Sequence, residues 1–149
     1  MTTTQGSMQG TPHKVMLTMS WDDGFPADLR VAELMARYGI RGIFYVPIQN
    51  LEGLPVMSPE ALRQLASLHE IGSHTYRHCY LNSLSAGEAN REIASGKAAL
   101  EDMLGRAVTG FCYPGGKFNR NHVSMVQMQD STTPGALRIY APTYRSTGS

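Results

Sequence analysis

The chain has 149 residues, enough for one domain with a real core, and its 42% hydrophobic and 17% charged residues are typical of an ordinary globular protein. Thirteen basic against twelve acidic side chains give a formal net charge of +1, which does not indicate binding to nucleic acid or to an anionic membrane. No stretch reaches the roughly 20 apolar residues of a membrane span, and the polar start of the chain does not resemble a secretory signal. We therefore expect a cytoplasmic protein with no nucleic-acid or membrane partner, in which Cys79 and Cys112 are free thiols.

Strand and helix patterns alternate along most of the chain. Residues 1–13 are polar and glycine-containing, and they predict a flexible tail. Short apolar runs that end at turn residues predict strands, whereas apolar residues at helical spacing predict helices. In chain order, the predicted elements are a strand over 14–20, a helix over 26–39, a strand over 42–47, a helix over 58–70, a strand over 70–74, a helix over 85–105, a strand over 108–114 and a helix over 121–129.

Capping residues mark the ends of two of these helices. Ser58 is a suitable N-cap, and Pro59 follows it at the first helical position. Ser85 and Glu88 have the spacing of a capping box, and Gly105 can end the same helix in a left-handed conformation. The helix over 85–105 is therefore the best defined by local sequence.

The alternation predicts an α/β domain over residues 14–130, in which helices cover a mainly parallel sheet. Residues 131–149 are rich in Ser, Thr, Gly and Pro, and they predict an irregular tail. In a parallel sheet, the carboxyl ends of the strands lie at the same edge. The predicted strands end at "SWDDG", "YVP", "SHTYRH" and "YPGGK", so these four segments should meet at one rim. This convergence indicates a functional site.

Two histidines and two aspartates are the reactive side chains expected at this rim. His74 and His78 are four residues apart, which on a helical turn would bring both rings to one ion. Asp22 and Asp23 repel each other unless a cation lies beside them, so we expect one to bind a metal and the other to remain a free general base. Two histidines and one carboxylate would leave coordination positions open for water and substrate. An Asx turn is the alternative for the aspartate pair taken alone.

A "YPGG" turn over residues 113–116 follows the last predicted strand at the same rim. Its backbone N–H groups could face an oxyanion, although such a sequence taken alone is most often only a turn. The GxxxxGK[ST] pattern of a phosphate-binding loop is absent. The turn therefore indicates a functional role only in combination with the aspartates and histidines expected at the same rim.

Together these motifs resemble those of the metal-dependent polysaccharide deacetylase family, carbohydrate esterase family 4. "LTMSWDDG" looks like the family's first motif, which implies that Asp22 is the catalytic base and Asp23 a metal ligand. "GSHTYRH" looks like the second motif, which implies that His74 and His78 are the other metal ligands.

"FCYPGG" is similar to the third motif of the family, which forms one wall of the active-site groove. The resemblance implies that Tyr113, Pro114 and Gly115 line this groove, with the Gly115 N–H donating to the oxyanion. It extends from about Lys14 to Asn119 and implies a distorted (β/α) barrel, here incomplete.

The resemblance also implies a reaction: hydrolysis of an N-acetyl group on an amino-sugar saccharide. The implied cofactor is a divalent ion, zinc first, with cobalt or another ion as alternatives. The ion would bind the acetamide oxygen and lower the pKa of a bound water, whose proton Asp22 would accept. Because no signal segment is visible, we expect a soluble N-acetylated saccharide or a small amide as the substrate.

Three departures from the family pattern leave alternatives open. Cys112 stands where an arginine often begins the third motif, Gly115 stands where an aromatic residue is common, and no histidine beyond residue 130 can serve as the family's general acid. The chain could thus be a catalytically impaired fragment that binds metal and saccharide or completes its barrel with a partner chain. A non-haem iron oxygenase is a further alternative for two histidines and a carboxylate. An unclosed sheet would also expose a strand edge, through which a homo-oligomer could form.

Overall fold

The elements alternate between strand and helix in the predicted order. The computed structural model describes residues 17–130 and 138–140. Each predicted strand and helix has a counterpart, and two short 3₁₀ helices and one further strand are added. In chain order, the elements are β1 (Ser20–Trp21), α1 (Asp28–Arg37), β2 (Ile43–Val46), α2 (Pro59–Leu68), β3 (Glu70–Ser73), the 3₁₀ helix η1 (Leu81–Ser83), α3 (Ala86–Leu104), β4 (Gly110–Cys112), the 3₁₀ helix η2 (Pro114–Gly116), α4 (Arg120–Asp130) and β5 (Arg138–Tyr140).

The predicted caps of α2 and α3 are confirmed. The Ser58 hydroxyl accepts a hydrogen bond from the Ala61 N–H at 3.3 Å, and Pro59 is the first residue of α2. At the start of α3, Ser85 and Glu88 form both hydrogen bonds of a capping box. Gly105 ends α3 with φ of +64°, a conformation that glycine adopts without the steric cost of a Cβ.

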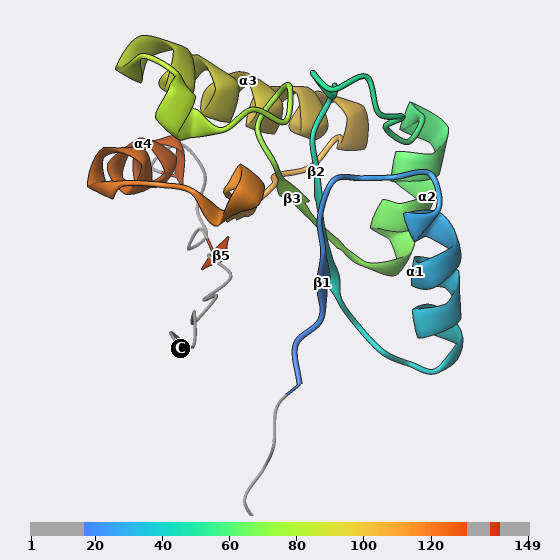
Figure 1. Cartoon of the computed structure of the whole chain (residues 1–149). Helices are drawn as coiled ribbons and strands as arrows, with labels where there is room; N and C mark the ends of the chain where they lie inside the picture. The colour runs from blue at the N-terminus through green and yellow to red at the C-terminus, as the bar shows by residue number, and fades with distance from the viewer. Residues whose placement is uncertain (1–16, 131–137, 141–149) are drawn as a thin grey trace, which may run out of the picture.

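The strands form one parallel sheet in the order β1-β2-β3-β4-β5, so the prediction of a parallel α/β fold is confirmed. Figure 1 shows the helices beside this sheet, where α1 packs on α2, α2 on α3 and α3 on α4. Within the described residues, β1 and β5 each pair on one side only, so the sheet is open. The arrangement is an incomplete (β/α) barrel, as expected.

Apolar side chains of the sheet and helices form two main buried clusters. The larger one joins β2 and β3 to α1, α2 and α3, and the second joins β4 to α3 and α4. The larger cluster consists of Ala32, Met35, Phe44, Val46, Met57, Leu62, Leu65, Ile71, Leu100 and Val108, and the second of Leu81, Ala89, Ile93, Phe111, Tyr113 and Val126. Because neighbouring residues of a strand point to opposite faces, Ile43, Tyr45 and Cys112 form a separate buried group.

Most elements differ from their predicted bounds by one or two residues at an end, and the differences are largest at the two edge strands. Among the described residues, the first strand is Ser20–Trp21, and the Ile43 N–H also donates to the Met19 carbonyl at 3.0 Å; residues 14–16 of the predicted strand lie outside the described residues. Strand β5 lies inside the segment 131–149 that was predicted to be irregular, because its backbone pairs with β4, a contact distant in sequence. The predicted tail over 1–13 and the remainder of 131–149 lie outside the described residues.

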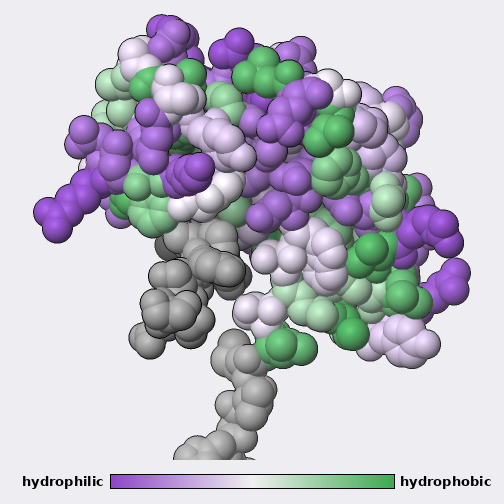
Figure 2. Space-filling model, viewed as in Figure 1, coloured by the Kyte–Doolittle hydropathy of each residue, from purple (hydrophilic) through white to green (hydrophobic). Residues whose placement is uncertain are grey.

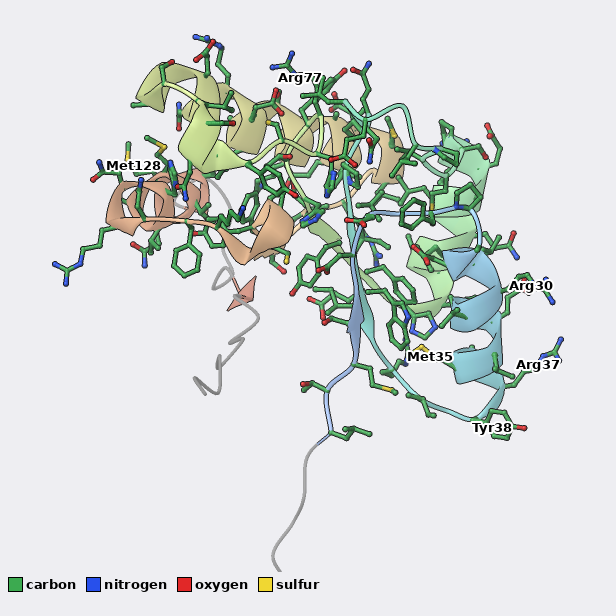
Figure 3. All side chains as sticks on the ribbon, in the orientation of Figure 1. Arg30, Met35, Arg37, Tyr38, Arg77 and Met128 are labelled. Atoms are coloured by element: carbon green, nitrogen blue, oxygen red, sulfur yellow. The ribbon has the colours of Figure 1, made fainter. Side chains whose placement is uncertain are left out.

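Polar and apolar side chains occupy different parts of the molecular surface. Figure 3 shows Arg30, Arg37 and Tyr38 pointing away from α1, whereas Met35, on its opposite face, is buried. In the view of Figure 2, polar residues predominate over α3, and apolar residues gather lower, around β1. None of the helices in the described part of the chain is both long enough and apolar enough to cross a bilayer. The homo-oligomer expected through the sheet edge stays a prediction.

Candidate metal centre

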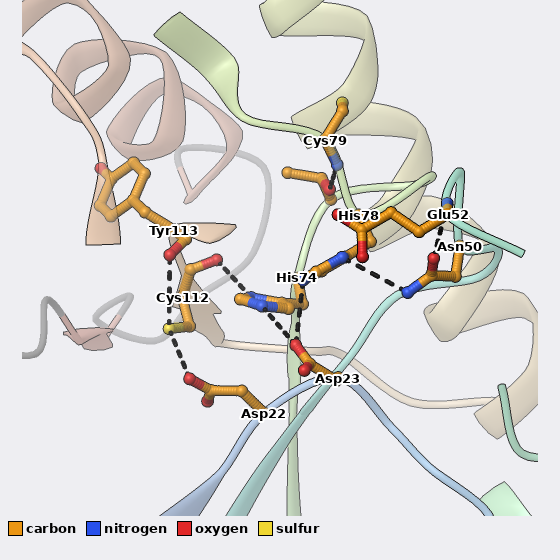
Figure 4. A network of polar contacts seen from close by, with 10 residues as sticks. Asp22, Asp23, Asn50, Glu52, His74, His78, Cys79, Cys112 and Tyr113 are labelled. Carbon is orange, nitrogen blue, oxygen red and sulfur yellow. Dashed lines mark hydrogen bonds and ion pairs between the residues drawn. The ribbon is translucent and has the colours of Figure 1, made fainter. Parts of the chain in front are cut away.

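The carboxyl ends of β1 and β3 bring three predicted metal ligands together (Figure 4). Asp23 follows β1, and His74 and His78 follow β3. One Asp23 oxygen, Oδ1, lies 3.4 Å from the Nε2 atom of His74 and 3.0 Å from the Nε2 atom of His78. One possible ligand atom from each residue lies within 4.8 Å of the other two. The predicted convergence at one rim is therefore confirmed for this group.

A tight turn after β1 directs Asp23 toward the histidines. Asp23 has φ of +74° and Gly24 has φ of +63°, so two consecutive residues are left-handed. Aspartate tolerates this region better than most residues, and glycine adopts it freely. A Cβ at Gly24 would also lie 2.7 Å from Cγ1 of Val46 on the neighbouring strand. The glycine of "DDG" is thus required both by conformation and by space.

The histidine pair converges, but not through the predicted helical turn. Residues 74–80 have no helical assignment, and Thr75 and His78 have φ of +67° and +55°. The two imidazole rings nevertheless lie 5.1 Å apart between centroids. An irregular loop therefore does what the four-residue spacing suggested a helix would do.

Helix α3 holds this loop in place from outside. The buried carboxylate of Glu92 accepts hydrogen bonds from the Arg77 N–H at 2.9 Å and from Arg77 Nε at 2.6 Å. The Glu92 carbonyl accepts another from the Tyr76 N–H at 3.0 Å. Gly96, one turn further along, approaches so closely that a Cβ would lie 2.7–2.8 Å from the Thr75 and Tyr76 backbone. The three hydrogen bonds to Glu92 and the close approach of Gly96 thus fix the backbone between the two histidines.

The outer nitrogen of His74 is held in the state that metal binding needs. His74 is 1% exposed, and its Nδ1 atom lies 2.9 Å from the Cys112 carbonyl oxygen. Because a carbonyl can only accept, Nδ1 carries a proton, and Nε2 is the ring nitrogen that faces Asp23 and could bind an ion. Metal-binding histidines are commonly oriented in this way by a carbonyl or carboxylate.

The donor set fits a catalytic divalent ion. Two imidazole nitrogens and one carboxylate oxygen leave further coordination positions, and the Asp23 side chain is 34% exposed, so solvent reaches the site. The contacts of Asp23 with His74, and then with His78, lower the pKa of Asp23, which favours the carboxylate that a metal requires. Burial raises the pKa of the Cys112 thiol well above its usual range, so this cysteine keeps its proton and does not resemble a zinc thiolate.

Asp22 is exposed and stands apart from the three ligands. Its Oδ2 atom accepts a long hydrogen bond from the Cys112 thiol, with Sγ at 3.6 Å. A carboxylate that is close to the ligand group but not among its members can accept a proton. The role of Asp22 as the general base stays a prediction.

Sequence and structure comparisons address the family. The model of the polysaccharide deacetylase family matches residues 9–133. The chain belongs to the polysaccharide deacetylase family. Among curated relatives, the chain is 25% identical over 133 residues to the polysaccharide deacetylase homologue YxkH of Bacillus subtilis (strain 168). This match covers 84% of the chain and 47% of YxkH. It is also 28% identical over 92 residues to a chitin deacetylase of Pestalotiopsis sp, covering 61% of this chain and 31% of the relative. The chain thus spans less than half the length of either relative.

Solved deacetylase structures share the fold. The Streptococcus pyogenes deacetylase PplD, determined in complex with acetate, superimposes with a TM-score of 0.71 over 82% of this chain and 56% of its own, at 16% identity. The chitin deacetylase of Colletotrichum lindemuthianum gives a TM-score of 0.63 over 72% of this chain and 49% of its own, at 22% identity. The open sheet therefore matches an incomplete (β/α) barrel of the deacetylase type.

The third family motif contributes differently from expectation. The Tyr113 side chain is fully buried and packs between Phe111 and Phe118, so only its backbone could line a groove. Burial raises its pKa to about 12. Pro114 is also buried, whereas Gly115 is exposed with φ of +61°. The Gly115 N–H as an oxyanion donor stays a prediction.

Three residues around the ligands were not assigned roles from sequence. Cys112 contacts both Asp22 and His74, Asn50 contacts His78, and Glu92 holds the loop. Cys112 lies in the strand predicted over 108–114, and Asn50 follows the strand predicted over 42–47, so their positions near the same rim were the available signal. No signal in the sequence pointed to Glu92, because it lies within the helix predicted over 85–105 and not at the end of a predicted strand.

A third carboxylate near the candidate metal centre, that of Asp28, lowers the stability of the fold in a pH-dependent way. Asp28 is 8% exposed and its Oδ2 atom has no hydrogen-bond partner. Burial raises its pKa above the ordinary 3.8, and the charges of Asp23 and Asp22 add to this, against a hydrogen bond from the Phe25 backbone. Ionised Asp28 therefore destabilises the fold, and this cost grows as the pH rises through its folded pKa.

We expect Asp28→Asn to raise the melting temperature at pH 7 by roughly 2–4 °C, the shift that ~1 kcal/mol gives in a domain of this size. Thermal unfolding with chelator, at pH 7 and near pH 3, measures it. Near pH 3 both side chains are neutral and the two proteins should melt together. An equal gain at both pH values would show that charge is not the cause.

Proposed function

We propose that this chain carries the catalytic base and metal ligands of a metal-dependent deacetylase that removes N-acetyl groups from an amino-sugar saccharide. The observation that carries the proposal is the convergence of Asp23, His74 and His78, with Asp22 free beside them. Membership of the polysaccharide deacetylase family supports the same reaction class.

Asp23, His74 and His78 would hold the ion through one oxygen and two Nε2 atoms. A bound divalent ion, for which zinc is our choice, would supply a Lewis acid that activates water and polarises the acetamide carbonyl. Asp22 would accept the proton of the attacking water, because its carboxylate lies beside the ligands without being needed by them. Cys112 would keep Asp22 oriented through its thiol.

The proposed substrate class is based on the relatives that the chain matches. One matched relative is named a chitin deacetylase, which favours N-acetylglucosamine oligomers as first substrates. A small amide would use the same ligands and base. The competing function is that of a catalytically impaired domain, which would bind metal and saccharide without releasing acetate.

Acetate release from N-acetylglucosamine oligomers tests the proposal. The protein would be assayed with zinc, with cobalt and with chelator, and zinc binding would be measured separately by calorimetry. We expect release that disappears with chelator and returns with metal. Zinc binding without acetate release would favour the impaired domain, and oxygen-dependent turnover with ferrous iron would favour an oxygenase.

A further inference from the structure

The two histidines proposed to bind metal differ in the partner of Nδ1, the ring nitrogen that faces away from Asp23: one partner can only accept a hydrogen bond and the other can only donate one. Nδ1 of His74 faces the Cys112 carbonyl, which can only accept a hydrogen bond. Nδ1 of His78 faces the side-chain nitrogen of Asn50, at 3.4 Å. An amide nitrogen can only donate, so this contact requires an unprotonated Nδ1 on His78.

The orientation of the Asn50 amide is fixed by a second contact. Its oxygen, Oδ1, accepts a hydrogen bond from the Glu52 backbone N–H at 2.8 Å, an Asx-type turn within the loop that follows β2. The amide oxygen is therefore committed to Glu52, and the amide nitrogen is left for His78. In this arrangement His78 carries its proton on Nε2, where Asp23 Oδ1 accepts it at 3.0 Å.

This state of His78 is incompatible with binding an ion through Nε2. That nitrogen must present its lone pair, which moves the proton to Nδ1 and demands an acceptor there. The Asn50 amide is the polar group in contact with Nδ1, and it can accept only by turning over.

We propose that Asn50 is the positioning residue of His78, and that metal loading turns its side-chain amide over, so that its oxygen leaves the Glu52 N–H and accepts from His78 Nδ1–H. The inference rests on the proposed metal site. It makes the loop after β2 respond to the ion, because one oxygen cannot serve both donors fully. The metal-free protein satisfies Glu52, and the loaded protein satisfies His78.

Asn50→Asp tests this directly, because a carboxylate offers one oxygen to Glu52 and another to His78. We expect zinc affinity to rise about tenfold, within the range that outer-sphere partners of metal ligands control. Exposed Gln49→Glu is the matched control, since it adds the same charge one residue away without the contact to His78. An equal gain in Gln49→Glu would assign the effect to charge and overturn the proposal.

Nuclear magnetic resonance gives a readout independent of activity. In the parent protein, zinc should move the His78 proton from Nε2 to Nδ1 and shift the Glu52 amide proton upfield as its hydrogen bond is lost. In Asn50→Asp, zinc should leave the Glu52 amide proton nearly unchanged. A Glu52 signal insensitive to zinc in a parent protein that binds zinc overturns the role of Asn50, whereas absence of zinc binding would instead contradict the metal site.

Discussion

Replacing Asp22 by asparagine should lower the rate of acetate release by about 10²–10⁴-fold while zinc binding stays intact. This range is what a positioned general base typically contributes. Asparagine keeps the size of the side chain, and its oxygen can still accept from the Cys112 thiol, whose Sγ lies 3.6 Å from Asp22 Oδ2. What is lost is the ability to accept a proton, so the effect should fall on turnover rather than on substrate binding.

The matched control for Asp22→Asn is Asp23→Asn, one residue further along. Asp23 lies within 3.4 Å of both histidine Nε2 atoms, so its neutral variant should lose zinc affinity as well as activity. Calorimetry with zinc and the acetate assay separate the two variants. If Asp22→Asn lost metal and Asp23→Asn kept it, the assignment of ligand and base would have to be exchanged.

Gly96→Ala should destabilise the fold by about 1–3 kcal/mol and weaken zinc binding. This is the usual cost of adding a methyl group to a filled space. Its Cβ would lie 2.7–2.8 Å from backbone atoms of Thr75 and Tyr76, which cannot move aside as a flexible side chain could. Because these residues lie between His74 and His78, any displacement moves the two ligands apart.

The same helix provides the control. Gly87 lies in the first turn of α3, and the nearest atom to a Cβ there is the end of the Arg91 side chain at 3.7 Å. Gly87→Ala should therefore be neutral or stabilise by up to about 1 kcal/mol, as alanine does for glycine in an unconstrained helix position. Urea unfolding of both variants, with and without zinc, measures the contrast. Equal effects at the two positions would show that helix propensity, and not the close approach to the histidine loop, decides the outcome.

Features governed by neighbouring residues could be predicted from the sequence. The capping box at Ser85 and Glu88 and the left-handed Gly105 are local devices, and they formed as expected. The gathering of strand ends at one rim also follows from a general property of parallel sheets, so Asp23, His74 and His78 could be grouped before any coordinates.

Features governed by distant contacts could not be predicted. The His74–His78 segment is irregular because Glu92 and Gly96 of α3 hold its backbone, a constraint that the spacing of two histidines does not contain. Tyr113 lies in the motif expected to form a groove, but its ring is buried in a cluster with side chains distant in sequence, among them Leu81 and Ile93. Strand β5 depends on pairing with β4, and a three-residue strand has too little periodicity to be recognised.

The edge position of β1 makes assembly of the site a question of local opening. Within the described part of the chain, β1 pairs over two residues and with β2 alone, yet it brings Asp23 to the histidines that follow β3. Short edge strands open at a lower free energy than the interior of a domain. A ligand that binds only the assembled state stabilises it by RT ln(1 + [L]/Kd), about 2.7 kcal/mol at a hundredfold excess over Kd. An ion held by these ligands would thus restrain a short edge strand of the sheet, and its measured affinity would include the free energy of closing that strand.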